Sequence, residues 1–119
     1  MIGRLSSVVL DCRNPKALAE FYSQLLGLPV TRVEDDWVDV GGQDGTPKLA
    51  FQLAPDHEPP TYRDPEHPQQ MHLDVHVDDV DTAEERALAI GATRLPGEGG
   101  DFRVYADPAG HPFCLVWDV

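Results

Sequence analysis

The sequence predicts an α+β fold built from two β-α-β-β-β modules, because one pattern of residues occurs twice along the chain. Residues 6–27 read as a strand, a helix-capping signal, a helix and a glycine, and residues 71–91 repeat that order. Each copy then runs into a final apolar strand, KLAFQLA in the first and HPFCLVWDV in the second. Repetition of this extent indicates two structural modules with a shared interior. We expect a single domain, with module one at 1–54, a linker at 55–69 and module two at 70–119.

Module one is expected to begin with a strand near residues 4–12. Asn14 and Pro15 then give a capping residue and a first helical residue. Gly27 is placed to end the helix in the left-handed conformation. The apolar side chains between these signals recur at helical spacing: Leu18, Phe21, Tyr22, Leu25 and Leu26. Turn signals rich in glycine separate three further expected strands, at 29–34, 37–41 and 48–54.

The linker and module two follow the same logic. Residues 55–69 hold five of the eleven prolines, which favours an extended loop over a helix or a central strand. Module two is expected to open with a strand at 71–77. A helix starts after Asp78 and Asp79 and ends at Gly91, with one apolar face formed by Val80, Ala83, Ala87 and Ile90. Strands are then expected at 92–95, 102–106 and 112–118, with a type I turn at 107–110 between the last two.

Composition excludes several classes of function. The formal net charge is −12, and the chain lacks the clustered Lys and Arg that bind nucleic acid or anionic membranes. Its apolar runs are too short for a membrane-spanning helix, and its N-terminus lacks the apolar stretch of a signal peptide. We therefore expect a cytoplasmic protein without nucleic-acid or membrane partners. In that compartment Cys12 and Cys114 are expected to stay reduced.

Strand alternation predicts where a binding site lies. One face of the expected strands is almost entirely apolar and should pack under the helices. The other face mixes polar and small side chains, which suits the lining of a cavity, although a solvent-exposed sheet face is the alternative. Arg103 and Tyr105 join this second face by parity, because Phe102, Val104 and Ala106 make the more apolar helix-facing set. The ligand-binding residues expected on this face are Ser7, Trp37, Gln52, His72, Asp74, Arg103, Tyr105 and Cys114.

His72, Asp74 and His76 form the most distinctive cluster, since alternate residues of a strand share one side. A carboxylate between two imidazoles can orient a tautomer or tune basicity. These three residues are therefore the catalytic candidates, with a general base or a metal ligand as the chemical interpretation. The alternative is a set of satisfied polar groups on the sheet surface. Cys114 is interpreted as a small packing residue, because no matched base for a nucleophile is visible.

The chain resembles the vicinal oxygen chelate superfamily, which includes glyoxalase I, bleomycin-resistance proteins, fosfomycin-resistance proteins and extradiol dioxygenases. The resemblance rests on AEFYSQLLGLPV, HLDVHVDDVD and FRVYADPAGHPFCLVWD and covers essentially the whole chain. It implies that the two modules form a cupped, eight-stranded mixed sheet with the helices outside. Because one fold hosts many chemistries, the resemblance indicates the fold more strongly than the reaction.

The resemblance also implies where a divalent cation would bind. The matching positions in this sequence are Ser7, Gln52, His72 and Cys114. His72 fits the pattern, but Ser7 stands where His or Gln is typical, and Gln52 and Cys114 stand where Glu is typical. Hard cations prefer carboxylate oxygens, which this set lacks. We therefore expect no cofactor and no bound divalent metal.

Three functions remain open from the sequence. The first is a metal-independent protein, similar to the bleomycin-resistance and glyoxalase-like branches, that binds a small organic ligand. The second is a lyase, isomerase or dioxygenase in which His72 acts as a base or metal ligand. The third is a structural or regulatory module with a vestigial pocket. For the first function we expect a small, flat or anionic ligand whose oxygens contact Arg103. Whatever the function, we expect a homodimer, because the resemblance implies pairing and two cupped modules leave sheet edges that need covering.

Overall fold

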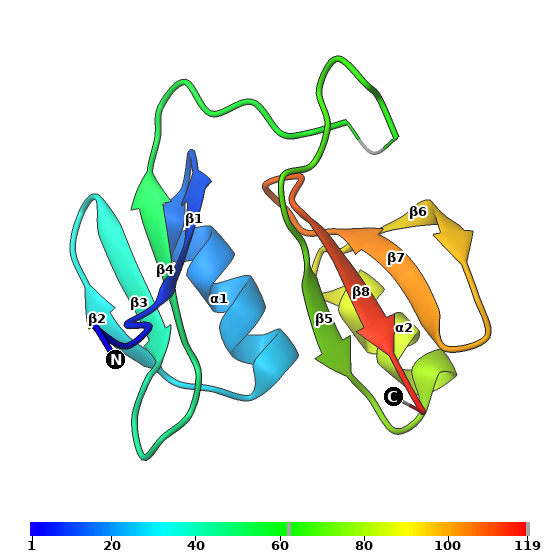
Figure 1. Ribbon diagram of the computed structural model, residues 1–119, viewed down its shortest axis with the longest axis horizontal. Helices are drawn as coiled ribbons and strands as arrows, with labels where there is room; N and C mark the ends of the chain where they lie inside the picture. Colours follow the sequence, from blue (N-terminus) through cyan, green and yellow to red (C-terminus); the bar gives the residue numbers. More distant parts are fainter. Residues whose placement is uncertain (62, 119) are drawn as a thin grey trace. The chain divides into compact units, whose positions relative to one another are not determined.

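The computed structural model describes residues 1–61 and 63–118 and confirms the α+β fold with two β-α-β-β-β modules (Figure 1). Tyr62 of the expected linker and the terminal Val119 lie outside the described residues. The chain divides into two compact units between residues 57 and 58, within the expected linker. Each unit contains one four-stranded mixed sheet and one helix. We call these units module one and module two.

Module one contains β1 (Val8–Cys12), α1 (Pro15–Leu26), β2 (Val30–Val33), β3 (Trp37–Gly41) and β4 (Lys48–Leu53). Its strand order is β1-β4-β3-β2, with β1 parallel to β4 and the other pairs antiparallel. Module two repeats this arrangement with β5 (Leu73–His76), α2 (Val80–Ala89), β6 (Thr93–Glu98), β7 (Phe102–Ala106) and β8 (Pro112–Val116). Its order is β5-β8-β7-β6, with β5 parallel to β8.

Apolar packing attaches α1 to its sheet. The Asn14 side chain caps the helix by accepting a 3.1 Å hydrogen bond from the Ala17 amide, and Gly27 ends it with φ of 66°. Tyr22 is fully buried and its ring stacks on that of Phe51 in β4, with the ring centroids 5.4 Å apart. This contact places α1 against the face of the sheet that carries Phe51, as the helical spacing predicted.

Polar contacts attach α2 to its sheet. Asp79 caps the helix by accepting from the amides of Asp81 and Thr82, and Ala87 is its buried residue. Glu84 points to the sheet, where it accepts a 2.8 Å hydrogen bond from the Tyr105 hydroxyl. Arg94 and Arg103 also donate to Glu84, at 2.9 and 3.3 Å. The face of the second sheet that carries Tyr105 and Arg103 is therefore the helix-facing one.

Element ends differ from the prediction at several places. β1 begins at Val8 rather than residue 4, because β4 offers it partners only from Leu49 onward. β6 extends to Glu98, beyond the expected residue 95, and its pairing with β7 is irregular around Pro96. The linker contains no helix or strand among its described residues, but it forms local turns, with the Thr61 amide donating to the His67 carbonyl at 2.8 Å.

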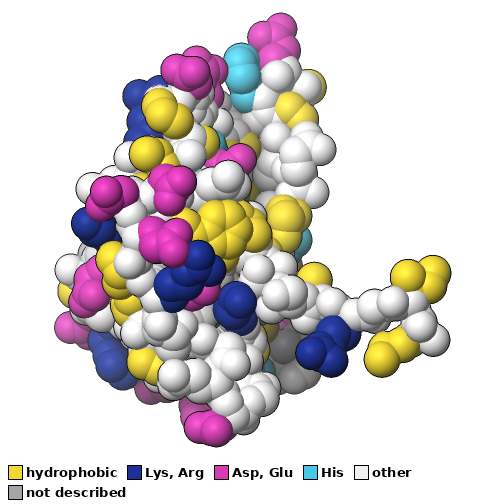
Figure 2. Space-filling view, turned by 90° about the vertical axis from the view of Figure 1, so that its left-hand side faces the viewer, with side chains coloured by type: hydrophobic (Ala, Val, Ile, Leu, Met, Phe, Trp, Pro, Cys, Tyr) yellow, Lys and Arg dark blue, Asp and Glu magenta, His cyan; other side chains and the backbone are white. Residues whose placement is uncertain are grey.

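The surface agrees with the acidic composition. Figure 2 shows acidic side chains scattered over the visible face, with basic side chains between them rather than in one basic patch. Scattered charge of this kind suits a hydrated surface. Within the described residues, no helix has the length and apolar character needed to cross a membrane.

Candidate functional site

The register of β7 and β8 decides which residues share the face opposite α2. Val104 pairs with Cys114, whereas Arg103 pairs with Leu115 and Tyr105 pairs with Phe113. Paired residues project to the same side of a sheet. Because Tyr105 and Arg103 contact Glu84 of α2, Val104 and Cys114 lie on the opposite face.

A cavity of about 370 Å³ lies on that opposite face of module two. Its polar lining comes from the chain before β5 and before β7, from β5 itself and from the middle of β8: Gln69, His72, Asp74, Asp101 and Cys114. Its apolar lining consists of Phe102, Val104, Pro112 and Val116. A concave site with an apolar wall and a few polar groups is typical of small-molecule binding.

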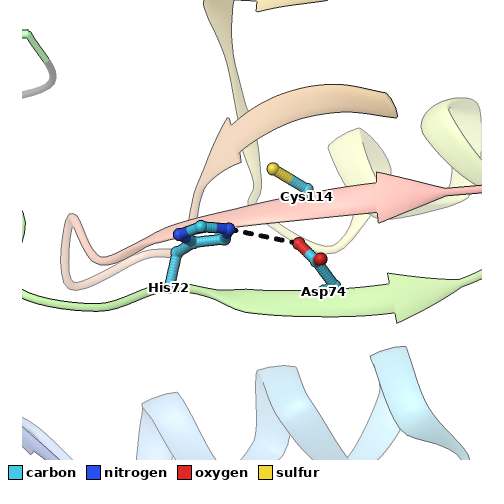
Figure 3. A group of neighbouring side chains, drawn as sticks. All are labelled: His72, Asp74 and Cys114. Carbon is cyan, nitrogen blue, oxygen red and sulfur yellow. Dashed lines mark ion pairs between the residues drawn. The ribbon is translucent and has the colours of Figure 1, made fainter. Parts of the chain in front are cut away.

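His72, Asp74 and Cys114 lie together in this cavity (Figure 3). The His72 Nε2 atom is 3.3 Å from the Asp74 Oδ1 atom, and both side chains remain partly exposed. Asp74 pairs with Cys114 across the β5–β8 ladder. One nitrogen, one carboxylate oxygen and the sulfur of these residues all lie within 4.8 Å of one another. The Asp74 carboxylate can therefore orient the His72 imidazole, as the spacing of the two residues predicted.

Cys114 has the character of an unreactive thiol. Burial, together with the smaller effect of the adjacent Asp74 carboxylate, raises the pKa of this thiol from an ordinary value of 9.0 to about 11. A thiol with such a pKa is protonated at neutral pH and is a poor nucleophile. This agrees with the interpretation of Cys114 as a packing residue in the cavity wall.

The alkylation rate of Cys114 should reveal this pKa. In a Cys12→Ala background, the rate of carbamidomethylation at Cys114 is expected to keep rising above pH 10, toward a midpoint near pH 11. Because the folded pKa exceeds the unfolded one, the neutral thiol stabilises the folded state below about pH 9, and this contribution is lost as the pH rises through 11. Mass spectrometry across this pH range measures the rate. A midpoint near pH 9 in the folded protein, as in the urea-unfolded control, would contradict the assignment.

The predicted placement of Arg103 and Tyr105 on the cavity face is wrong. Arg103 donates to Asp81 at 3.0 Å and to Glu84 at 3.3 Å, and Tyr105 is fully buried with its hydroxyl on Glu84. Burial raises the pKa of Tyr105 to about 12. We had assigned the two faces of β7 by assuming that the helix covers the more apolar side of the strand. Here α2 presents carboxylates, so the basic and phenolic side chains lie under the helix and Phe102 and Val104 line the cavity.

The remaining predicted residues belong to module one or lie beside the cavity. Trp37 pairs with Gln52 across β3 and β4, and its indole donates a 2.7 Å hydrogen bond to Asp39. Ser7 precedes β1 and is half-buried. None of these three lines the cavity of module two. His76 shares the face of Asp74 and is exposed, but it is not among the lining residues. Their roles in binding or catalysis stay predictions.

The ladders also show which residues of the two modules correspond. Val9 pairs with Ala50 across β1 and β4, just as Asp74 pairs with Cys114 across β5 and β8. The counterpart of Cys114 in module one is therefore Ala50, and Gln52 lies two residues further along β4. The group His72, Asp74 and Cys114 thus corresponds to Ser7, Val9 and Ala50, so the polar group is specific to module two.

Two polar lining residues were not predicted. Gln69 ends the expected linker and Asp101 immediately precedes β7, so both lie outside the strands. Strand alternation gives no information there. The only sequence signal for Asp101 was its position directly before β7. The two faces of β7 were exchanged in the prediction, so this signal could not be used.

The side chains at the metal position implied by the resemblance do not fit the hard divalent cation of the metal-dependent members of the superfamily. By the strand register the matching positions are Ser7, Ala50, His72 and Cys114, which offer a hydroxyl, an imidazole and a thiol but no carboxylate. Asp74 adds one carboxylate to the group in module two, but the Cys114 thiol would have to lose a proton that burial favours keeping. A second group in the linker, Asp64, Glu66 and His67, is largely exposed, and His67 contacts Asp64 directly at 3.2 Å.

Comparison with known proteins agrees with this architecture. The model of the glyoxalase-like domain family matches residues 7–116, which is nearly the whole chain. The comparison with curated proteins found no match.

Solved structures share the fold at low sequence identity. A glyoxalase/bleomycin resistance protein/dioxygenase family enzyme from Burkholderia phytofirmans PsJN has a TM-score of 0.75 and 22% identity, over 98% of this chain and 100% of that one. A glyoxalase-related enzyme from Fulvimarina pelagi has a TM-score of 0.71 and 20% identity, over 98% and 89%. The fosfomycin resistance protein FosX from Mesorhizobium loti has a TM-score of 0.69 and 18% identity, over 98% and 92%.

Proposed function

Because the chain belongs to the glyoxalase-like domain family, we propose that it binds a small organic molecule in the cavity of module two without a metal ion. The observation that carries this proposal is the lining of the cavity. Four apolar residues form one part of the wall, and five polar residues converge on the same space. This combination buries the body of a ligand while fixing its orientation through hydrogen bonds.

The size of the cavity supports a ligand of limited size. A volume of about 370 Å³ lies near the lower end of the range for small-molecule sites. The solved neighbours include one whose name records fosfomycin resistance. Membership of the glyoxalase-like domain family supports the binding of a small molecule, and the lining residues support the cavity of module two as the place where it binds.

A second function, general-base catalysis, is favoured by one specific contact. The 3.3 Å approach of His72 Nε2 to Asp74 Oδ1 resembles the arrangement in which a carboxylate orients an imidazole for proton transfer. In that case the other ring nitrogen, Nδ1, would take the proton from a substrate in the cavity. A His72→Gln variant that retains ligand binding but loses turnover would distinguish catalysis from binding alone.

The metal-independent proposal predicts that the protein purified without chelator contains well below one equivalent of divalent metal per chain. It also predicts that EDTA leaves the affinity for a fragment hit unchanged, because no ligand contact depends on a metal ion. Elemental analysis measures the first result. A fragment screen by ligand-observed NMR, repeated with EDTA, measures the second.

The control for this prediction is a His72→Ala variant analysed in parallel. One equivalent of zinc, nickel, manganese or iron that is lost in this variant would contradict metal independence while leaving ligand binding open. Failure of every fragment to bind the wild-type protein in a saturable way would contradict ligand binding itself.

A further inference from the structure

The cavity of module two is negatively charged. Asp74 and Asp101 line it, and none of its described lining residues is Lys or Arg. Arg103 lies on the other face of the sheet, where Asp81 and Glu84 bind it. We expected an anionic ligand because Arg103 was predicted to lie beside the cavity. Arg103 does not line the cavity, so the described lining residues give no reason to expect an anion. The net charge of −12 acts in the same direction, because it raises the local concentration of cations around the protein.

Gln69 gives an independent indication of what the ligand offers. Its Oε1 atom is buried and has no hydrogen-bond partner in the described part of the chain. Gln69 lines the same cavity as the two carboxylates. A buried acceptor without a donor is costly and is rare in native proteins. Rotation of the Gln69 amide toward the cavity would let a ligand that brings N–H donors satisfy this acceptor and the Asp74 and Asp101 carboxylates together.

The apolar wall defines the rest of the ligand. Phe102, Val104 and Val116 lie on the same side of the sheet as Asp74. Such a wall suits a hydrocarbon body, and an aromatic ring also attracts an adjacent cation. A bare inorganic cation would leave this surface without a partner.

We propose that the ligand of this site is a small organic cation, with an ammonium or amidinium group on an apolar body. The proposal rests on the proposed function, since it names the ligand class of the same cavity. The charged group donates to Asp74, Asp101 and the Gln69 Oε1 atom, and the apolar body contacts Phe102 and Val104.

Three probes of similar size and different charge test this inference: benzylamine, benzyl alcohol and benzoate. Each is titrated into isotopically labelled protein, and affinity is read from the backbone amide shifts of cavity residues. Benzylamine is expected to bind about tenfold more tightly than benzyl alcohol, and benzoate more weakly than either. The preference for benzylamine should fall as the salt concentration rises.

Variants assign the preference to the carboxylates. The Asp74→Asn and Asp101→Asn double variant is expected to lose the tenfold preference while still binding benzyl alcohol. Asp78→Asn is the matched control, because Asp78 is an exposed carboxylate of module two outside the cavity lining, and it should keep the preference. Equal or tighter binding of benzoate or benzyl alcohol would overturn the cation inference and leave the proposed function standing. No shift in the cavity amides with any probe would overturn both.

Discussion

Replacing Phe113 by alanine is expected to lower the free energy of unfolding by about 3–5 kcal/mol. Phe113 is fully buried, and its ring stacks on Tyr105 with the ring centroids 5.4 Å apart. The substitution removes this contact and leaves a cavity beneath α2, which rigid neighbouring strands fill only in part. Because Phe113 lies between the lining residues Pro112 and Cys114, the same change is expected to weaken ligand binding.

Urea unfolding measures this effect separately for module two. The chain has two tryptophans, Trp37 in module one and Trp117 in module two, so a Trp37→Phe background leaves Trp117 as the fluorescent probe. Met71→Ala is the control, because Met71 is an apolar residue of module two that is 53% exposed, and it should change stability by less than about 0.5 kcal/mol. A loss from Phe113→Ala no larger than that of Met71→Ala would contradict the packing of Phe113 beneath α2.

Replacing Glu84 by alanine is expected to cost about 2–3 kcal/mol, which is large for a residue on a helix surface. Glu84 accepts hydrogen bonds from Tyr105, Arg94 and Arg103. Its side chain is only 27% exposed, so the three donors left behind are incompletely hydrated. The buried Tyr105 hydroxyl loses the partner that Glu84 provides.

Two variants separate the causes. Glu85→Ala removes an exposed carboxylate from the adjacent position of α2 and should leave stability within about 0.5 kcal/mol of wild type. Glu84→Gln keeps an acceptor for Tyr105 but removes the charge that pairs with the two arginines, so its loss should be intermediate. Urea unfolding monitored by Trp117 fluorescence again gives the values. Equal stability of the Glu84→Ala and Glu85→Ala variants would refute the anchoring role of Glu84.

The elements of the fold could be predicted because their local signals agree with one another. Asn14, Pro15 and Gly27 define the ends of α1 independently of the rest of the chain, and the apolar spacing between them gives the buried face. Asp79 does the same for α2. The repeated order of elements then led to the two sheets. The exact ends of β1 and β6 could not be predicted, because they depend on where a partner strand begins or becomes irregular.

The candidate site could be predicted only where the strand faces were unambiguous. His72, Asp74 and Cys114 lie in the cavity because β5 and β8 have a clearly apolar opposite face. The faces of β7 were predicted wrongly, because its polar side faces α2 and its more apolar side lines the cavity, the reverse of a typical amphipathic strand. The exchange has a physical cause in Asp81 and Glu84 of α2, which compensate the Arg103 guanidinium. To predict this exchange from the sequence, one would have to know that Arg103 pairs with Asp81 and Glu84, which lie about twenty residues earlier in the chain.

The sequence-based expectations of a homodimer and a cytoplasmic location stay predictions. So does the participation of Ser7, Trp37 and Gln52, which belong to module one.

We propose above all that a small organic molecule binds in the cavity of module two, on the face of the sheet opposite α2. Amide shift mapping of labelled protein with a saturating fragment hit tests it most directly. The largest shifts are expected on the cavity residues Asp74, Val104 and Cys114. Smaller shifts are expected on Arg103 and Tyr105, which lie on the α2 side of the sheet. Shifts centred on the α2 side of the sheet, or on Ala50 and Gln52 of module one with the cavity residues unmoved, would contradict it.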